Sequence, residues 1–116
     1  MDYKFINTEY IESVTGGDKE IVRELVDIFR NQVTEIAAEM KVLYSKGDFH
    51  TLGLLAHKAK SSVAIMGMND LAIMLKAFEI DGKEGKNTEN YESYIQRYET
   101  EAGLAGLELE SYINNL

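Results

Sequence analysis

The chain contains no proline in its 116 residues, so nothing in it imposes the break that this residue makes inside a helix. Glycine remains as the main residue that can end a helix, and glycines occur at Gly16-Gly17, Gly47, Gly67 and Gly82. Alanine, leucine, glutamate, lysine and methionine, which are favourable in helices, are plentiful between these points. We therefore expect an all-helical protein.

The longest uninterrupted segment, between Gly17 and Gly47, predicts one amphipathic helix. Its apolar residues recur every three to five positions, which is typical of a single buried stripe. The residues expected in this stripe are Ile21, Leu25, Ile28, Phe29, Val33, Ile36, Met40 and Leu43. Gly47 suits the left-handed end of this helix, and Asp48 suits the cap of the next one. So short a connection predicts antiparallel neighbours.

A short leading helix is expected after Asn7 or Thr8, either of which can cap it, and before the turn at 15–17. It carries the apolar residues Tyr10, Ile11 and Val14. Together with four longer helices it predicts one domain over residues 1–116. We expect an antiparallel up-down-up-down four-helix bundle with a short N-terminal helix.

The remaining helices are predicted over about 48–66, about 69–82 and about 91–112. The polar segment 81–90 is expected to be a loop, because it has two glycines, several charges and no apolar residue. Asn87 or Thr88 is expected to cap the last helix. The apolar residues of that helix recur at steps of three and four from Tyr91 onward, which predicts a buried face.

The formal net charge of −8 argues against nucleic acid as a partner, because phosphate backbones select basic surfaces. No apolar run approaches the roughly 20 residues that cross a bilayer, and residues 1–10 are unlike a signal peptide. The absence of cysteine excludes disulfides and thiolate metal sites and fits a reducing compartment. We therefore expect a cytoplasmic protein without a membrane partner. Met1 and the lack of a linker-like segment favour a free-standing protein.

The segment 52–79 predicts two helices folded back on each other at the turn 67–70. Position 68 lies midway between His57 and Glu79, so an antiparallel hairpin brings the two side chains to the same height. Packed helices lie roughly 8–10 Å apart, and a glutamate side chain bridges much of that distance. We expect the carboxylate to meet the imidazole.

The helix that carries His57 has two different faces at roughly 100° per residue. The expected core face is Leu52, Leu55, Ala59, Ser62, Val63 and Met66, with Ser62 bonded to a backbone carbonyl one turn earlier. The face around His57 carries small residues, one lysine and apolar flanks. This predicted docking face consists of Gly53, Leu54, Lys60, Ser61, Ala64 and Ile65. Small side chains let a partner approach closely, and the apolar flanks supply burial. The alternative is a surface histidine that has small neighbours by chance.

A neutral imidazole attacks phosphorus through one ring nitrogen while the other keeps its proton. A carboxylate such as Glu79 that accepts a hydrogen bond from this proton fixes the tautomer. Lys60 lies one turn after His57, within reach of a phosphoryl group that adds a charge of about −1.5 to −2. Each residue also has an alternative interpretation. Glu79 taken alone would be an exposed carboxylate at the end of a helix, and Lys60 taken alone would be a lysine that only adds solubility. His50 lies about 10 Å along the axis from His57, too far for both to bind one metal. No glycine-rich phosphate loop is present, so autokinase activity from ATP is not expected.

The residues around His57 resemble a known family. The segment Ala56-His57-Lys58-Ala59-Lys60-Ser61-Ser62 looks like the histidine-containing phosphotransfer (HPt) family of multistep phosphorelays. Lys60, Ser62, Gly67 and Glu79 stand at offsets +3, +5, +10 and +22 of the family pattern. The end of the preceding helix, 44–48, is similar too. The chain departs from the pattern at +4, where Ser61 replaces glycine, and at +6, where Val63 replaces a small residue.

The resemblance implies that His57 takes a phosphoryl group from the aspartate of one receiver domain and gives it to the aspartate of another. The donor would belong to a hybrid histidine kinase and the acceptor to a response regulator. Magnesium would belong to the receiver, so no cofactor is expected here. The resemblance thus implies a monomeric phosphocarrier rather than an enzyme, with Lys60 as charge partner and Glu79 as the residue that orients the imidazole.

Two alternatives use the same fold. The first is a non-catalytic adaptor that binds a receiver domain without exchanging phosphate, and Ser61 is the residue that favours it. The second is a helical dimerisation module built on the tyrosines of the last helix: Tyr91, Tyr94, Tyr98 and Tyr112.

Overall fold

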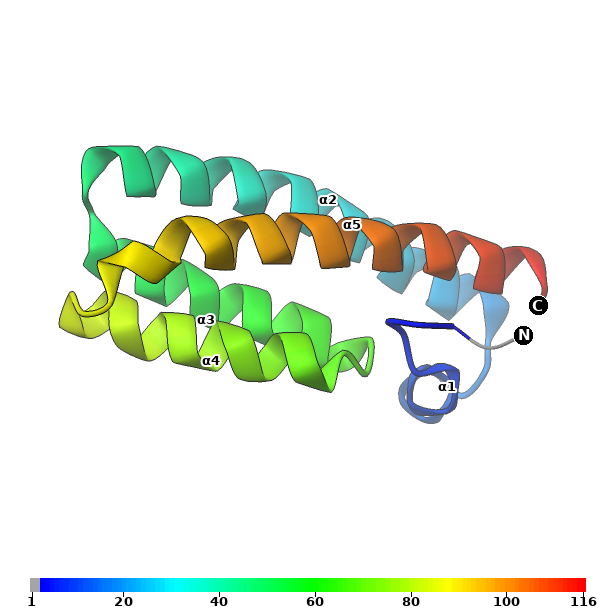
Figure 1. Cartoon of the computed structure of the whole chain (residues 1–116). Helices are drawn as coiled ribbons and strands as arrows, with labels where there is room; N and C mark the ends of the chain where they lie inside the picture. Colours follow the sequence, from blue (N-terminus) through cyan, green and yellow to red (C-terminus); the bar gives the residue numbers. More distant parts are fainter. Residues whose placement is uncertain (1–2) are drawn as a thin grey trace.

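The computed structural model describes residues 3–116, which are all-helical and contain no strand (Figure 1). This agrees with the predicted all-helical class. The elements in chain order are α1 (Thr8–Thr15), α2 (Lys19–Lys46), α3 (Phe49–Ile65), α4 (Asn69–Glu84), the 3-10 turn η1 (Thr88–Asn90) and α5 (Tyr91–Asn114).

The long helices α2 and α5 lie side by side, and the shorter helices α3 and α4 form a second pair next to them (Figure 1). The ends of α2 and α5 extend beyond the α3–α4 pair, and α1 lies across this extension. The molecule is therefore elongated, with extents of 43 × 20 × 19 Å. One cluster of buried apolar side chains runs through it, with contributions from all five α-helices.

Several helix ends follow local sequence chemistry. The side chain of Asn7 accepts a hydrogen bond from the amide of Tyr10 at 3.1 Å, and that of Asp48 accepts one from the amide of Thr51 at 3.3 Å. Gly47 ends α2 with a φ of 73°, a left-handed conformation that glycine adopts without steric cost. The predicted caps at Asn7 and Asp48 and the predicted stop at Gly47 are therefore confirmed.

The predicted loop over 81–90 is wrong in its first part, because α4 continues to Glu84. Gly85, with a φ of 65°, ends the helix, whereas Gly82 is helical and lies against Gly53 of α3. Packing between the two helices therefore overrides the loop composition. The predicted cap of α5 is also wrong. Asn87 has a φ of 55° and makes no capping bond, and the η1 turn precedes the helix.

The first half of α2 buries a stripe adjacent to the predicted one. Val22 and Val26 are buried, whereas Ile21 and Ile28 are 49 % and 56 % exposed. Two apolar stripes lie next to each other on these turns, and the short helix α3 does not extend along them (Figure 1). The second half follows the prediction, and its buried residues include Val33, Ile36, Met40 and Leu43.

The tyrosines of α5 do not form an exposed surface. Tyr91 and Tyr98 are fully buried, and Tyr94 and Tyr112 are partly buried against the core. The dimerisation alternative therefore lacks the surface on which it was based.

One carboxylate of α5 binds the backbone of the N-terminal segment. Glu108 accepts hydrogen bonds from the backbone amides of Lys4, Phe5 and Ile6 at 2.9, 2.9 and 3.1 Å. The amide of Asn7 donates to the carbonyl of Met66 at 3.1 Å, which connects the same segment to the end of α3. Within residues 3–116, no helix is both long and apolar enough to span a bilayer.

Candidate functional site

Helices α3 and α4 approach closely because a glycine faces a glycine. A Cβ on Gly53 would lie 2.8 Å from both the carbonyl oxygen of Glu79 and the amide nitrogen of Lys83, and one on Gly82 would lie 2.8 Å from the Cα of Gly53. The prediction that Gly53 belongs to the exposed docking face is therefore wrong. This residue lies on the side of α3 that faces α4, and it is buried there.

The close approach brings His57 and Glu79 together, as the counting from the turn predicts. The Nδ1 atom of His57 lies 3.0 Å from Oε1 of Glu79. The imidazole is 55 % exposed, whereas Glu79 is only 5 % exposed. Glu79 is thus a buried carboxylate and not an exposed one at a helix end. Because an ionised carboxylate only accepts hydrogen bonds, this contact places a proton on Nδ1, and in the neutral form of the ring Nε2 then holds the lone pair.

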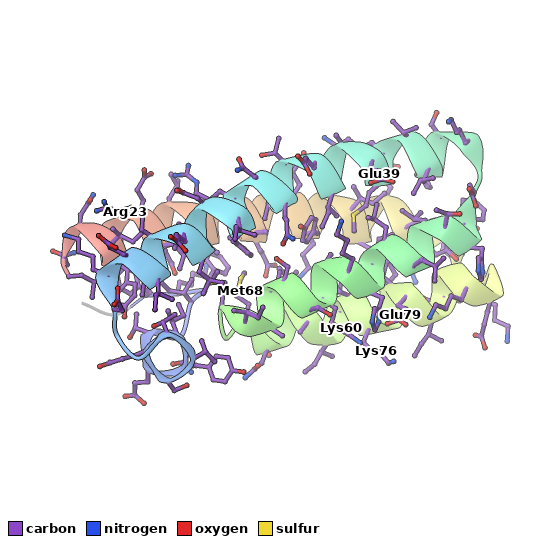
Figure 2. The ribbon with its side chains drawn as sticks, turned by 180° about the vertical axis from the view of Figure 1, so that it is seen from behind. Arg23, Glu39, Lys60, Met68, Lys76 and Glu79 are labelled. Atoms are coloured by element: carbon purple, nitrogen blue, oxygen red, sulfur yellow. The ribbon has the colours of Figure 1, made fainter. Side chains whose placement is uncertain are left out.

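Three lysines surround the same carboxylate. Lys83 donates to Oε2 of Glu79 at 2.8 Å, Lys60 donates to Oε1 at 3.4 Å, and the Nζ of Lys76 lies 3.9 Å from Oε1. Figure 2 shows Lys60, Lys76 and Glu79 together on the α3–α4 pair. Lys76 and Lys83 were not predicted as part of the site. The spacing of Glu79 and Lys83, four residues apart on one helix, was the available signal.

These contacts keep Glu79 ionised. The hydrogen bond from Lys83 is the largest influence and lowers the pKa, burial raises it, and the hydrogen bond from His57 lowers it again. The result is a pKa of about 2 instead of the ordinary 4.5. Glu79 therefore remains an acceptor for His57 at any pH near neutrality.

The two serines next to this site lie on the faces predicted for them, but Ser61, and not Ser62, makes the hydrogen bond to a backbone carbonyl. Ser61 is exposed, and its hydroxyl lies 3.3 Å from the carbonyl oxygen of His57, to which it donates. Ser62 is buried but donates to Oε1 of Gln32 at 2.9 Å, so its predicted bond to a backbone carbonyl is wrong. Gln32 comes from α2, and its position depends on how α2 packs against α3.

The remainder of the predicted docking face is accessible. Leu54, Ser61 and Ile65 are exposed and Ala64 is partly exposed. Helix α4 adds apolar surface that was not predicted. Ile73 is 69 % exposed and Ile80 is also exposed. Apolar surface therefore lies on both helices that carry the His57–Glu79 pair.

Over residues 3–116, no group of three or more histidine, aspartate or glutamate side chains is placed to hold a metal ion. The chemistry of the site is that of one accessible imidazole with a fixed tautomer and nearby ammonium groups. Comparisons with models of protein families, with curated proteins and with solved structures found no match to this chain. Its function is therefore inferred from the site and from the sequence pattern.

Proposed function

We propose that the protein is a histidine phosphotransfer protein in which His57 carries the phosphoryl group between aspartates of receiver domains. The observation that best supports this is the exposed imidazole whose Nδ1 lies 3.0 Å from the buried carboxylate of Glu79. Its free Nε2 faces away from that contact, and the surrounding surface has small and apolar residues. The resemblance of residues 56–62 to the HPt family supports the same function.

The transfer balances without a further reactant. The lone pair of His57 Nε2 forms the N–P bond while the P–O bond to the donor aspartate breaks, and that aspartate leaves as a carboxylate. The proton stays on Nδ1, so the ring gains a formal positive charge, which the carboxylate of Glu79 offsets. In the second step a carboxylate oxygen of the acceptor aspartate attacks phosphorus. The N–P bond then breaks and the ring becomes neutral again.

In this proposal Lys60 moves to the phosphoryl group, because it lies one turn from His57 on the same helix. The chain acts as a cytoplasmic, monomeric carrier with the up-down-up-down topology of a four-helix bundle. A hybrid histidine kinase supplies the phosphoryl group, and a response regulator accepts it. The aspartyl pocket and its magnesium belong to the receiver domains, so the carrier needs no cofactor and no ATP site.

The test is transfer of radiolabel from a phosphorylated receiver domain to the full chain. We expect label that is labile in acid and stable in base, as a phosphohistidine is. His57→Gln should abolish uptake, whereas the control His50→Gln, in the exposed first turn of the same helix, should not change it. Label on the His57→Gln protein would contradict the proposal.

The exposed hydroxyl of Ser61 favours a second candidate, an adaptor that binds a receiver domain without taking phosphate. Ser61 lies one turn after His57, where an incoming receiver approaches most closely. The adaptor predicts that binding to the receiver is unchanged in His57→Gln and that no label is transferred. Ser61→Gly separates the two functions, because it should leave transfer intact or increase it in a phosphocarrier.

A further inference from the structure

The two oxygens of the Glu79 carboxylate are used by different partners. Oε2 accepts from Lys83 at 2.8 Å, while Oε1 faces Nδ1 of His57 at 3.0 Å and Nζ of Lys60 at 3.4 Å. A buried carboxylate needs a compensating charge, and a neutral imidazole supplies only a hydrogen bond. The compensating charge therefore comes from the lysines.

Lys83 and Lys60 hold this carboxylate differently. Lys83 follows Glu79 by four residues on α4, in the order that favours a glutamate–lysine pair, and its contact is the shorter one. Lys60 reaches across from α3 to an oxygen that already accepts from His57, and its contact is longer. Lys76 is more exposed than either and lies 3.9 Å away. Lys83 is thus the main counter-ion of Glu79.

We infer that Lys83 is a positioning residue that keeps Glu79 anionic and directed at His57 Nδ1, so that Lys60 is free to leave Glu79 for the phosphoryl group. The role of Lys60 in this inference rests on the proposed function, whereas the role of Lys83 does not. The inference adds to the proposed function that the two lysines have different roles: Lys83 positions Glu79, and Lys60 binds the phosphoryl group. The carboxylate keeps one cation at all times. The second cation becomes available on the face where Nε2 is exposed.

The charges support this exchange. A phosphoryl group on Nε2 adds about −1.5 to −2 charge beside Lys60. At the same time the ring acquires a formal positive charge next to Oε1 of Glu79. Glu79 then has Lys83 on one oxygen and a cationic ring on the other, so the departure of Lys60 leaves no buried anion unpaired. Without Lys83, Lys60 would be the nearest lysine to Glu79, at 3.4 Å, and its departure would leave the carboxylate with the ring and the more distant Lys76.

The first measurement requires no phosphate. Nitrogen NMR of the His57 ring reports its tautomer, and carbon NMR of the Glu79 carboxyl reports its titration. In Lys83→Met we expect a smaller fraction of the Nδ1–H tautomer and a higher pKa for Glu79. The charged groups that face this carboxylate are His57 and Lys60 from α3 and Lys76 and Lys83 from α4.

The matched controls separate a positioning role from a general loss of charge. Lys76→Met removes a lysine near the same carboxylate and should leave both NMR signals close to wild type. Lys83→Arg should restore both signals. Lys60→Met should leave the tautomer unchanged while it reduces phosphate uptake. The inference is overturned if Lys83→Met changes neither signal, or if Lys76→Met or Lys60→Met changes the tautomer as much.

The second measurement is transfer of label from a phosphorylated receiver domain. We expect Lys83→Met to slow uptake by about 10- to 100-fold, which is the loss that a misoriented reacting group causes. The loss should increase toward acid pH as Glu79 becomes protonated. If wild type takes up no label, the proposed phosphotransfer fails, and the NMR comparison still decides whether Lys83 positions Glu79 and His57.

Discussion

The α3–α4 pair and the α2–α5 pair are held together in different ways. Between α3 and α4, backbone meets backbone at Gly53 and Gly82, and the buried carboxylate of Glu79 joins side chains from both helices. Between α2 and α5, polar contacts such as Lys41–Glu99, at 2.7 Å, join side chains that are both exposed.

The difference separates contacts that fix a geometry from contacts that only add to association. Two backbones in contact cannot adjust their separation, and a buried charge cannot exchange its partner for water. The side chains of an exposed ion pair can change conformation and can exchange each other for water. Substitutions at the α3–α4 crossing should therefore change stability and the site together, whereas those in the exposed ion pairs between α2 and α5 should change neither by much.

The largest effect expected is the pH dependence that Glu79 confers. Its pKa of about 2 in the folded protein is below the ordinary 4.5, so the stability it contributes is complete above pH 4.5 and is lost as pH falls toward 2. At about 1.4 kcal/mol per pKa unit, the contribution is at most about 3 kcal/mol, and solvent screening of the partly exposed lysines reduces it. Urea unfolding measured between pH 2 and 7 should show this loss in wild type.

In Glu79→Gln that part of the pH dependence should be missing. Glu99→Gln, which removes an exposed carboxylate of the α2–α5 pair, should leave it unchanged. Equal pH profiles for Glu79→Gln and wild type would remove the energetic distinction between the two pairs.

The next largest effect concerns two glycines, one packed against the backbone of another helix and one with open space around it. Gly53→Ala should destabilise the fold by about 1–3 kcal/mol, because the new methyl group would meet the backbone of α4. Gly103→Ala should stabilise it by about 1 kcal/mol, because a Cβ there would meet no atom within 4 Å and alanine favours the helix.

Equilibrium unfolding measures both changes, and NMR of His57 should report a disturbed Nδ1 contact in Gly53→Ala only. A Gly53→Ala protein of wild-type stability would mean that α3 and α4 can separate without cost.

A smaller effect is expected within α5. The hydroxyl of Tyr98 is fully buried and has no hydrogen-bond partner among residues 3–116, so Tyr98→Phe should stabilise the protein by about 1 kcal/mol. The hydroxyl of Tyr91 lies 2.7 and 2.6 Å from the carbonyl oxygens of Asp81 and Lys86 and has a single proton to donate to them, so Tyr91→Phe should destabilise the protein by a similar amount. Opposite shifts in thermal midpoint are the expected readout, and shifts of the same sign would contradict it.

The smallest effect is expected for Lys41→Ala. The Lys41–Glu99 pair is exposed on both sides, and such pairs contribute below about 1 kcal/mol. The difference from wild type should disappear in about 1 M salt, because screening acts within a few ångströms at that concentration. A loss above about 2 kcal/mol, measured by urea unfolding, would place this contact among those that fix geometry.

Features that depend on local chemistry, or on the number of residues that separate a side chain from a turn, could be predicted from the sequence. The meeting of His57 and Glu79 requires only that both lie equally far from a turn near position 68. The cap at Asp48 and the stop at Gly47 depend on the backbone of a few residues. The all-helical class follows from propensity and from the absence of proline.

Features that depend on how one helix is rotated against another could not be predicted. Gly53 and Ser62 were placed on the correct helix, but their partners Gly82 and Gln32 come from other helices. Two adjacent apolar stripes on α2 made the choice between Ile21 and Val22 depend on which neighbours cover them. Lys83 was missed because 81–90 was expected to be a loop, which removed the helical spacing that links it to Glu79.

The attachment of the N-terminal segment has a consequence for sequence variation. Glu108 recognises only main-chain amides at Lys4, Phe5 and Ile6. Every amino acid except proline supplies that donor, so this contact puts no restriction on which side chains occur there. Position 108 is different, because three bonds end on one carboxylate. The exposed side chain at Lys4 can therefore vary without loss of this attachment, whereas Ile6 is restricted by its burial in the core and Glu108 by its three hydrogen bonds.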